Sequence, residues 1–138
     1  MGEFVKVDIR ALSGAALRWA FACALGYNVE PANDQRLRVL DEGILRGSFM
    51  MDDSPVPWYL AKWEPDQNWE QASYYIKKLD VSVSIMAVNG VYFCTDLTAS
   101  RRISHPFDSD VLSTALTRCL LAHLCRDYEF LVPKILVH

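Results

Sequence analysis

The dipeptide Asn89-Gly90 is the sequence feature that most limits how this chain can fold. Both residues accept positive φ, which the tight turn of a two-residue hairpin requires. Residues 81–88 (VSVSIMAV) alternate between two kinds of position before the turn, and residues 91–97 (VYFCTDL) follow it. A period of two is typical of a strand. We therefore predict an antiparallel hairpin that is closed at Asn89-Gly90.

Two helices are predicted before this hairpin. The first follows Ser13, whose hydroxyl can accept an amide of the first turn, and it ends at Gly26, which tolerates a left-handed backbone. It is almost wholly apolar, so it must be covered nearly all round. A short helix begins at Trp69, with Asn68 as its cap and Gln71 placed as in a capping box.

The clearest amphipathic helix comes after the hairpin, and we expect Asp108 or Ser109 to cap it. Its apolar stripe and its polar side are both well defined. The stripe consists of Leu112, Ala115, Leu116, Cys119, Leu120 and His123, and the polar side of Asp110, Ser113, Thr114, Thr117 and Arg118.

Strand patterns also occur at residues 4–9, 36–40 and 58–63, and the tail is extended with Pro133 keeping it at a sheet edge. Strands mixed with three helices favour the α+β class, as a layered sandwich of a mostly antiparallel sheet with two long helices and one short helix. The two long helices could enclose the sheet or share one face. A chain of 138 residues is expected to form a single domain, 1–138.

Composition excludes several classes of function. The net charge of −3 lacks the cationic footprint that nucleic acid demands, so nucleic acid is an unlikely partner. No run of 18 apolar residues predicts a membrane span. The charged N-terminal segment is unlike a secretory signal. The cysteines form no C-x-x-C pair, and we expect a reduced, cytoplasmic protein; they are Cys23, Cys94, Cys119 and Cys125.

Three stretches together, residues 7–26, 65–84 and 110–136, resemble the phage ABA sandwich domain, a family of small phage and prophage proteins of unknown function. The resemblance covers most of the chain and is weakest over residues 28–60. The family's two glycines after the central tryptophan are replaced here by Ala72-Ser73. The matching positions are Leu12, Ser13, Gly14, Trp19, Pro65, Asp66, Asn68, Trp69, Ala115, Arg118, Ala122, Glu129 and Pro133.

This resemblance implies a layered α/β/α-like sandwich and a phage or prophage origin. It implies no catalytic residue, and the sequence itself offers no reactive constellation. Cys119 and His123 are spaced to touch one ion, but no second ligand pair accompanies them, so we expect them to pack. No G-x-S-x-G or glycine-rich phosphate motif occurs. We therefore predict no metal, no cofactor and no enzyme.

Two candidate binding sites remain. Six large aromatic rings lie within residues 58–75, and tryptophan and tyrosine are frequent anchors of interfaces. They could equally cover the edge of the core, and Asn68 and Trp69 are first of all expected to act as cap and core anchor. The predicted partner-binding residues are Trp58, Trp63, Asp66, Gln67 and Trp69.

The second candidate is the polar loop before the last helix. Arg101, Arg102 and His105 could hold an anion together with amides of the helix N-terminus. The alternative is a solvated loop in which Asp108 already satisfies the cap.

These features favour a small phage- or prophage-derived, non-enzymatic binding protein that inhibits a host macromolecule, for example one of a defence system, by protein–protein contact. The alternative function is a binder of a small anionic ligand, such as a nucleotide, through Arg101, Arg102 and His105. A third hypothesis is a homo-oligomer in which the apolar tail adds to a neighbour's sheet edge.

Overall fold

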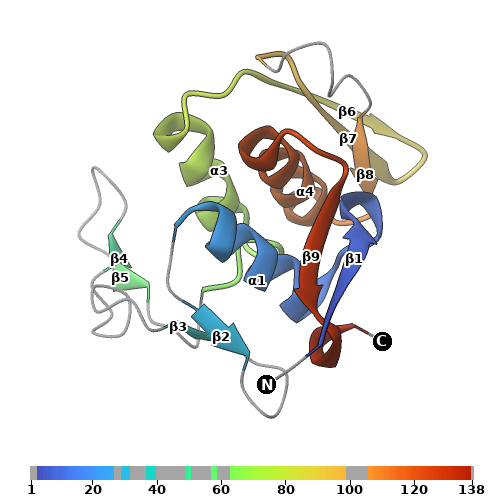
Figure 1. Ribbon diagram of the computed structural model, residues 1–138. Coiled ribbons are helices and arrows are strands. Elements are labelled where there is room, and N and C mark those ends of the chain that lie inside the picture. The colour runs from blue at the N-terminus through green and yellow to red at the C-terminus, as the bar shows by residue number, and fades with distance from the viewer. Residues whose placement is uncertain are drawn as a thin grey trace.

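The computed structural model describes residues 3–26, 29–31, 37–39, 49–50, 57–58, 63–98 and 106–137. Among the described elements, single α-helices separate groups of strands along the chain (Figure 1). The helices are α1 (Gly14–Ala24), α3 (Trp69–Lys78) and α4 (Leu112–Cys125), with 3-10 turns η1 (Ile9–Ala11) and η3 (Lys134–Leu136). The strands are β1 (Phe4–Asp8), β2 (Val29–Pro31), β3 (Leu37–Val39), β4 (Phe49–Met50), β5 (Pro57–Trp58), β6 (Val83–Val88), β7 (Val91–Asp96), β8 (Phe107–Ser109) and β9 (Glu129–Pro133).

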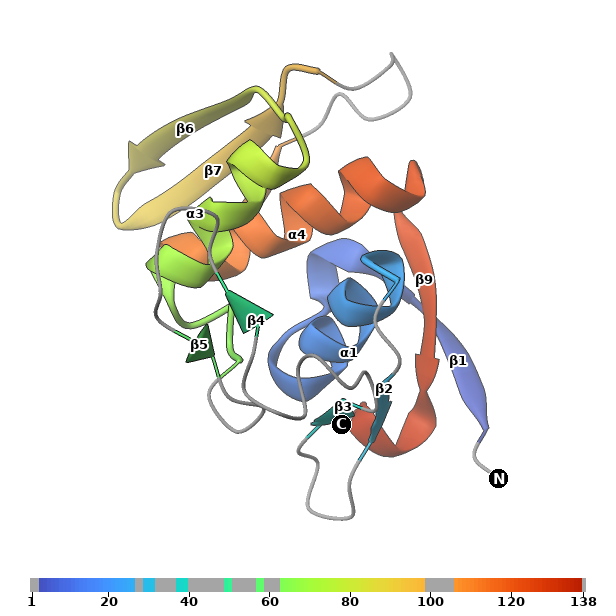
Figure 2. The ribbon, with the colours of Figure 1, turned by 90° about the vertical axis from the view of Figure 1, so that its left-hand side faces the viewer.

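The predicted α+β class is confirmed. Every described strand pairing is antiparallel, and the strands form separate sheets: β6-β7-β8, β1-β9, and the short pairs β2-β3 and β4-β5. α4 lies under β7 and β8, and α1 and α3 pack against its other sides (Figures 1 and 2). α1 in turn packs against β9. Among the described residues, no helix is long and apolar enough to span a bilayer.

The predicted hairpin is confirmed, with strands that begin at Val83 and end at Asp96. Strands β6 and β7 pair from Val83↔Asp96 to Val88↔Val91, so that Asn89 and Gly90 alone form the turn. Their φ angles are 51° and 81°. Two consecutive positive φ angles define the mirror-image turn whose twist matches that of the strands.

The predicted boundaries of α1 are also correct. Ser13 is its N-cap residue, although its side chain makes no capping hydrogen bond. Gly26 has φ 89° and donates its N–H to Cys23 O over 3.0 Å, which satisfies a carbonyl of the last turn. The apolar character of the helix is used in the core, where Leu17, Ala20 and Phe21 are fully buried.

The cap of α3 is the one that the sequence predicts. Asn68 Oδ1 accepts the N–H of Gln71 over 3.1 Å. The Gln71 side chain differs from the capping-box expectation, because its Oε1 accepts the N–H of Glu64 over 2.6 Å and so holds the preceding loop. Trp69 was wrongly predicted to anchor the core: it is 41% exposed, and Tyr75 is buried instead.

The start of α4 differs from the prediction. Asp108 and Ser109 belong to β8, and the N-cap residue is Val111, whose N–H donates to Ser109 Oγ over 3.0 Å. The prediction of a solvent-facing polar side is wrong as well. Thr114 and Thr117 are buried, because the helix is covered by a sheet and by two other helices.

The C-terminal tail pairs within its own chain. β9 runs along β1, from Phe4↔Pro133 to Asp8↔Glu129. One of the two edges of β9 is therefore occupied by β1. Only its other edge is left for the hypothesis that this tail adds to a neighbour's sheet. All four cysteines are free thiols.

Candidate binding surface on the three-stranded sheet

The structure does not describe the side chains of four residues that the sequence predicts for binding. Arg101, Arg102 and His105 lie outside the described residues. Trp58 lies in β5, where its backbone pairs with Phe49, and its side chain is outside the described part of the chain.

Trp63 was expected on a contact surface, and this prediction is wrong. Its side chain is 3% exposed. The indole ring stacks on Phe21 of α1 with a centroid distance of 6.1 Å, and its Nε1 donates to Tyr75 Oη over 3.1 Å. A buried tryptophan needs such a partner for its N–H, and Tyr75 supplies it from α3. Trp63 therefore joins α1 to α3.

Asp66, which was expected on the same surface, is fully buried, so this prediction is also wrong. Its Oδ1 lies 3.0 Å from Arg18 Nε, and its backbone carbonyl accepts the Thr114 hydroxyl over 2.7 Å. Burial raises the pKa of Asp66 although Arg18 opposes the shift. The residue fastens the loop to α1 and α4. Of the predicted residues whose side chains the structure describes, Gln67 and Trp69 are exposed.

His123 makes a contact that the helix pattern could not reveal. Its Nδ1 lies 2.6 Å from Oδ2 of the buried Asp96 on β7, and the other Asp96 oxygen accepts the N–H of Thr98 over 2.8 Å. Cys94 on β7 and Cys119 on α4 are fully buried, and burial raises the pKa of Cys94 to about 11 and that of Cys119 further. A nucleophilic cysteine needs a lowered pKa, so these thiols are poorly suited to attack. No cluster of metal-ligand type occurs among the described residues.

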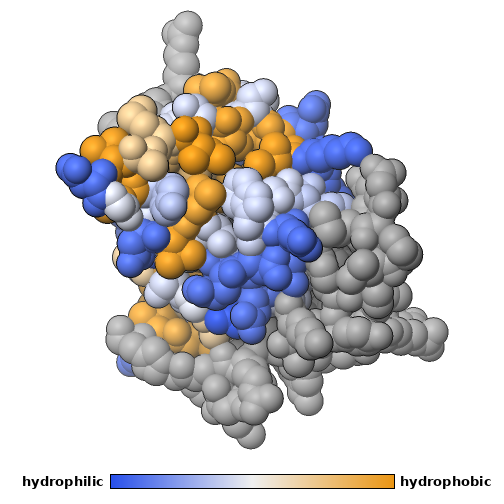
Figure 3. Space-filling model, turned by 180° about the vertical axis from the view of Figure 1, so that it is seen from behind, coloured by the Kyte–Doolittle hydropathy of each residue, from blue (hydrophilic) through white to orange (hydrophobic). Residues whose placement is uncertain are grey.

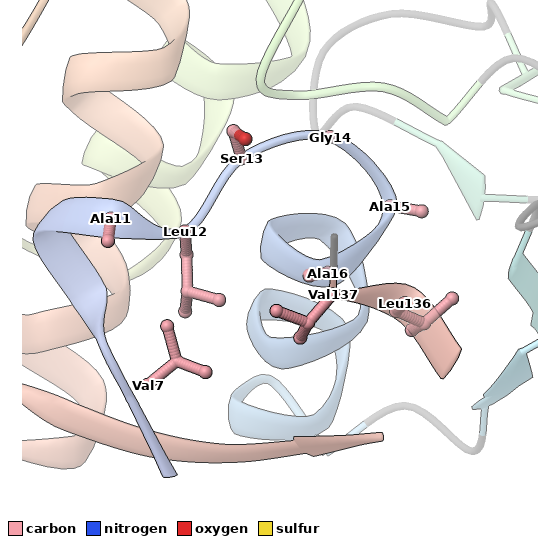
Figure 4. Close-up of a pocket in the computed structure, with 9 residues that line it drawn as sticks. All are labelled: Val7, Ala11, Leu12, Ser13, Gly14, Ala15, Ala16, Leu136 and Val137. Carbon is pink, nitrogen blue, oxygen red and sulfur yellow. The ribbon is translucent and has the colours of Figure 1, made fainter. Parts of the chain in front are cut away.

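A hollow of about 230 Å³ lies at the start of α1. Figure 4 shows the side chains of Val7, Leu12 and Val137 below the turn formed by Ser13 and Gly14. The lining side chains are almost all aliphatic, with the Ser13 hydroxyl as the one polar side-chain group, and backbone groups supply the rest of the polar lining. Such a lining offers no charge that would select an ionic ligand.

The strongest candidate is the face of the β6-β7-β8 sheet that points away from α4. Side chains alternate along β7. Cys94 and Asp96 are buried toward α4, so Phe93 and Thr95 point outward. Met86 is 59% exposed and Val88 44% exposed on this outer face. They line a shallow hollow of about 330 Å³ together with Ser84, Phe93, Thr95 and Pro106.

The surface colouring agrees with this assignment. Apolar atoms gather in the upper part of the face shown in Figure 3, in the region where Figure 1 places the sheet. The sequence prediction did not include this surface, because the alternation of residues 81–88 was used only to predict a strand of the hairpin. The signal was present, however: residues 81–95 contain no charged side chain. Comparisons with family models, with curated proteins and with solved structures find no match to this chain, so the geometry of the sheet is what identifies the site.

Proposed function

We propose that this protein is a non-enzymatic binding protein that captures a partner protein on the outer face of the β6-β7-β8 sheet. The observation that carries the proposal is the exposure of Met86 and Val88 beside Phe93 around one hollow. Monomeric soluble proteins rarely leave large contiguous apolar patches open, and such patches mark interaction sites.

The types of residue suit protein contact. Methionine is unbranched and adapts to irregular partner surfaces, and both methionine and phenylalanine are enriched at interfaces. Asp108, which pairs with Phe93 across β7 and β8, is exposed and places one negative charge on the same face. The complementary partner surface is therefore apolar at its centre, with polar or basic groups around it.

The resemblance to the phage ABA sandwich domain extends this proposal to the biological setting. It suggests a phage or prophage origin, action in the cytoplasm of the bacterial host, and a host macromolecule, for example one of a defence system, as the partner that is inhibited by contact. The anionic-ligand alternative stays a prediction, because Arg101, Arg102 and His105 lie outside the described residues.

The His123–Asp96 pair supports a structural role more than a catalytic one. It ties α4 to β7 at 2.6 Å, and Asp96 is held in turn by the Thr98 amide. A hydrogen-bonded partner satisfies the buried carboxylate, which would otherwise be costly to bury. The pair thereby fixes the sheet on the helix and keeps the outer face in shape.

The test is capture from host lysate with three immobilised proteins: wild type, Met86→Asp, and Leu131→Asp. Leu131 is a matched control, because it is an exposed apolar residue on β9, opposite Lys6 and away from the three-stranded sheet. A true partner binds wild type and Leu131→Asp, is lost with Met86→Asp, and stays bound at 0.5 M salt, since apolar contacts are not screened.

A captured protein that binds all three equally contradicts the proposed surface. If a specific partner is found, its dissociation constant should rise at least about tenfold with Met86→Asp, corresponding to about 1.4 kcal/mol. Absence of any captured protein across a range of salt concentrations contradicts the proposed function.

A further inference from the structure

The strand β6 lies at an edge of its sheet. The strand order is β6-β7-β8, and among the described residues β6 pairs with β7 alone. Figure 2 shows β6 on the outside of the molecule, beyond β7. An edge strand presents backbone N–H and C=O groups to whatever approaches it.

The hairpin register determines which groups these are. Leu97 N–H donates to Ser82 O over 2.7 Å, which identifies Ser82 and Leu97 as a hydrogen-bonded pair. Such pairs alternate along an antiparallel ladder. Ser84, Met86 and Val88 therefore turn their backbone groups toward β7. Those of Val83, Ile85 and Ala87 point to the open edge.

The β6 edge lacks the charged residues and the proline that the strands of the β1-β9 sheet carry. Natural edge strands are commonly guarded by charged residues or proline. β1 carries Lys6 and Asp8, and β9 carries Glu129 and Pro133. β6 has neither kind of residue, and no charge occurs anywhere in residues 81–95, although the chain has a net charge of −3. Two copies can therefore approach through β6 without like-charge repulsion between the facing strands.

The side chain of Ile85 provides an independent indication. Ile85 pairs with Cys94, so the two side chains share the face that looks toward α4. Cys94 is fully buried, whereas Ile85 is 43% exposed, because α4 contacts this sheet mainly at β7 and β8. An isoleucine that faces inward and still lies open needs a cover on its edge side.

We propose that two copies of this chain join through β6 in an antiparallel, two-fold symmetric pairing centred on Ile85. Ile85 then lies opposite Ile85 of the partner subunit, and Val83 lies opposite the partner subunit's Ala87. The two Ile85 side chains cover each other, and the outward N–H and C=O groups of both strands are paired. The result is one continuous six-stranded sheet, which goes beyond the proposed capture of a partner.

The symmetry has a consequence for the binding surface. The two-fold axis of an antiparallel pair is perpendicular to the sheet, so both copies of α4 lie on the same side. The two outer faces, each with Met86 and Phe93, then form one continuous surface on the opposite side. The dimer thus presents two identical hollows in the same direction.

A cysteine cross-link tests both the contact and its register. Ile85→Cys places two thiols directly opposite each other, within the Cα separation that a disulfide bridges. Ala87→Cys is the matched control, because the two copies of residue 87 would be about 14 Å apart along the strands. Mild oxidation should give a covalent dimer of Ile85→Cys, with little from Ala87→Cys or wild type, which share the native cysteines.

Light scattering gives the second measurement. Wild type and Leu97→Lys should show twice the chain mass of 15.7 kDa, whereas Ile85→Lys should show the chain mass itself. Leu97 is a strongly exposed apolar control that lies outside β6. Monomeric wild type at high concentration, together with no cross-linking of Ile85→Cys, overturns the proposal. Cross-linking at residue 87 and not at 85 overturns its register.

These outcomes are separable from those for partner capture. Failure of β6 pairing leaves the Met86→Asp comparison intact, because one copy already contains a complete hollow. Failure of capture leaves the mass and the cross-link unaffected. If Ile85→Lys does not fold, as judged by circular dichroism, the cross-linking comparison alone decides.

Discussion

Asp66 is a fully buried acid whose state depends on two opposing effects. Removal from water raises its pKa, and the Arg18 guanidinium lowers it from a distance of 3.0 Å. The contact with Arg18 is not aligned as a hydrogen bond, since neither Arg18 Nε nor Asp66 Oδ1 has a hydrogen-bond partner among the described residues. Desolvation therefore dominates, and the pKa lies above the ordinary value of 3.8.

This shift predicts a pH dependence of defined sign. The folded protein holds the Asp66 proton more tightly than the unfolded chain does, so the contribution of Asp66 to the unfolding free energy is complete below pH 3.8 and is lost as pH rises through the raised pKa. The unfolding free energy of wild type minus that of Asp66→Asn should therefore decrease from about pH 4 toward neutrality. Urea denaturation at several pH values measures it.

Asp8 serves as a control of opposite sign. The Arg10 side chain lowers the pKa of Asp8 through hydrogen bonds, so its stabilising contribution is present above the ordinary pKa and is lost as pH falls. The difference between wild type and Asp8→Asn should increase with pH. If both differences increase, Arg18 and not burial determines the state of Asp66.

The buried thiols make a second prediction at this scale. Burial raises the pKa of Cys94 to about 11 and also raises that of Cys119. In the native protein at pH 8, both should react with iodoacetamide no faster than the protein unfolds, whereas all four cysteines should react quickly in guanidinium. Peptide mapping distinguishes them from the half-buried Cys23 and Cys125. Rapid native labelling of Cys94 would indicate a reactive thiol beside the His123–Asp96 pair.

The elements that the sequence predicts well are those whose boundaries depend on local chemistry. Asn89-Gly90 fixes its turn because both residues adopt positive φ. Asn68 begins α3 because its side chain accepts an amide of the first turn. Neither feature needs a distant part of the chain, so a window of a few residues contains the information.

The features that the sequence predicts poorly depend on residues far away in the chain. Thr114 and Thr117 were assigned to a solvent-facing side of α4, yet both are buried. Thr114 donates to Asp66, which is 48 residues away, and Thr117 donates to Ser113 within its own helix over 2.7 Å. Satisfied hydroxyls can be buried at low cost, so helical periodicity cannot distinguish them from exposed ones. The burial of Trp63 could not be predicted for the same reason, because its indole N–H is satisfied by Tyr75, a partner outside its own strand pattern.

Arg118 gives a prediction at the scale of elements, because it joins α4 to β8 and to the segment between η1 and α1. Its Nε donates to Leu12 O over 2.8 Å and its Nη1 to Asp108 O over 2.5 Å. Lysine can satisfy at most one of these geometries, so Arg118→Lys should lose about 2 kcal/mol of unfolding free energy in urea. Arg10→Lys, at an exposed pair with Asp8, should lose clearly less, because solvent screens an exposed ion pair. Equal losses would contradict this role for Arg118.

At the scale of the whole molecule, the position of α4 explains why the binding surface could not be read from the sequence. Residues 81–95 are mostly apolar and carry no charge, which is equally typical of a strand buried on both faces. α4 covers only one face of the sheet and reaches β7 and β8. The outer face and the β6 edge are left open by the arrangement of layers, which no local pattern encodes.

The open edge predicts an alternating pattern of hydrogen exchange along β6. In the Ile85→Lys monomer, the amides of Ser84, Met86 and Val88 should exchange slowly because they bond to β7, and those of Val83 and Ala87 should exchange quickly. In the wild-type dimer, both sets should be slow, since the outward amides bond to the partner subunit. Residue-resolved exchange by NMR measures this. The alternating pattern in concentrated wild type would mean that the edge stays unpaired, whereas its absence from the monomer would mean that the ladder assigned from the Ser82–Leu97 bond is wrong.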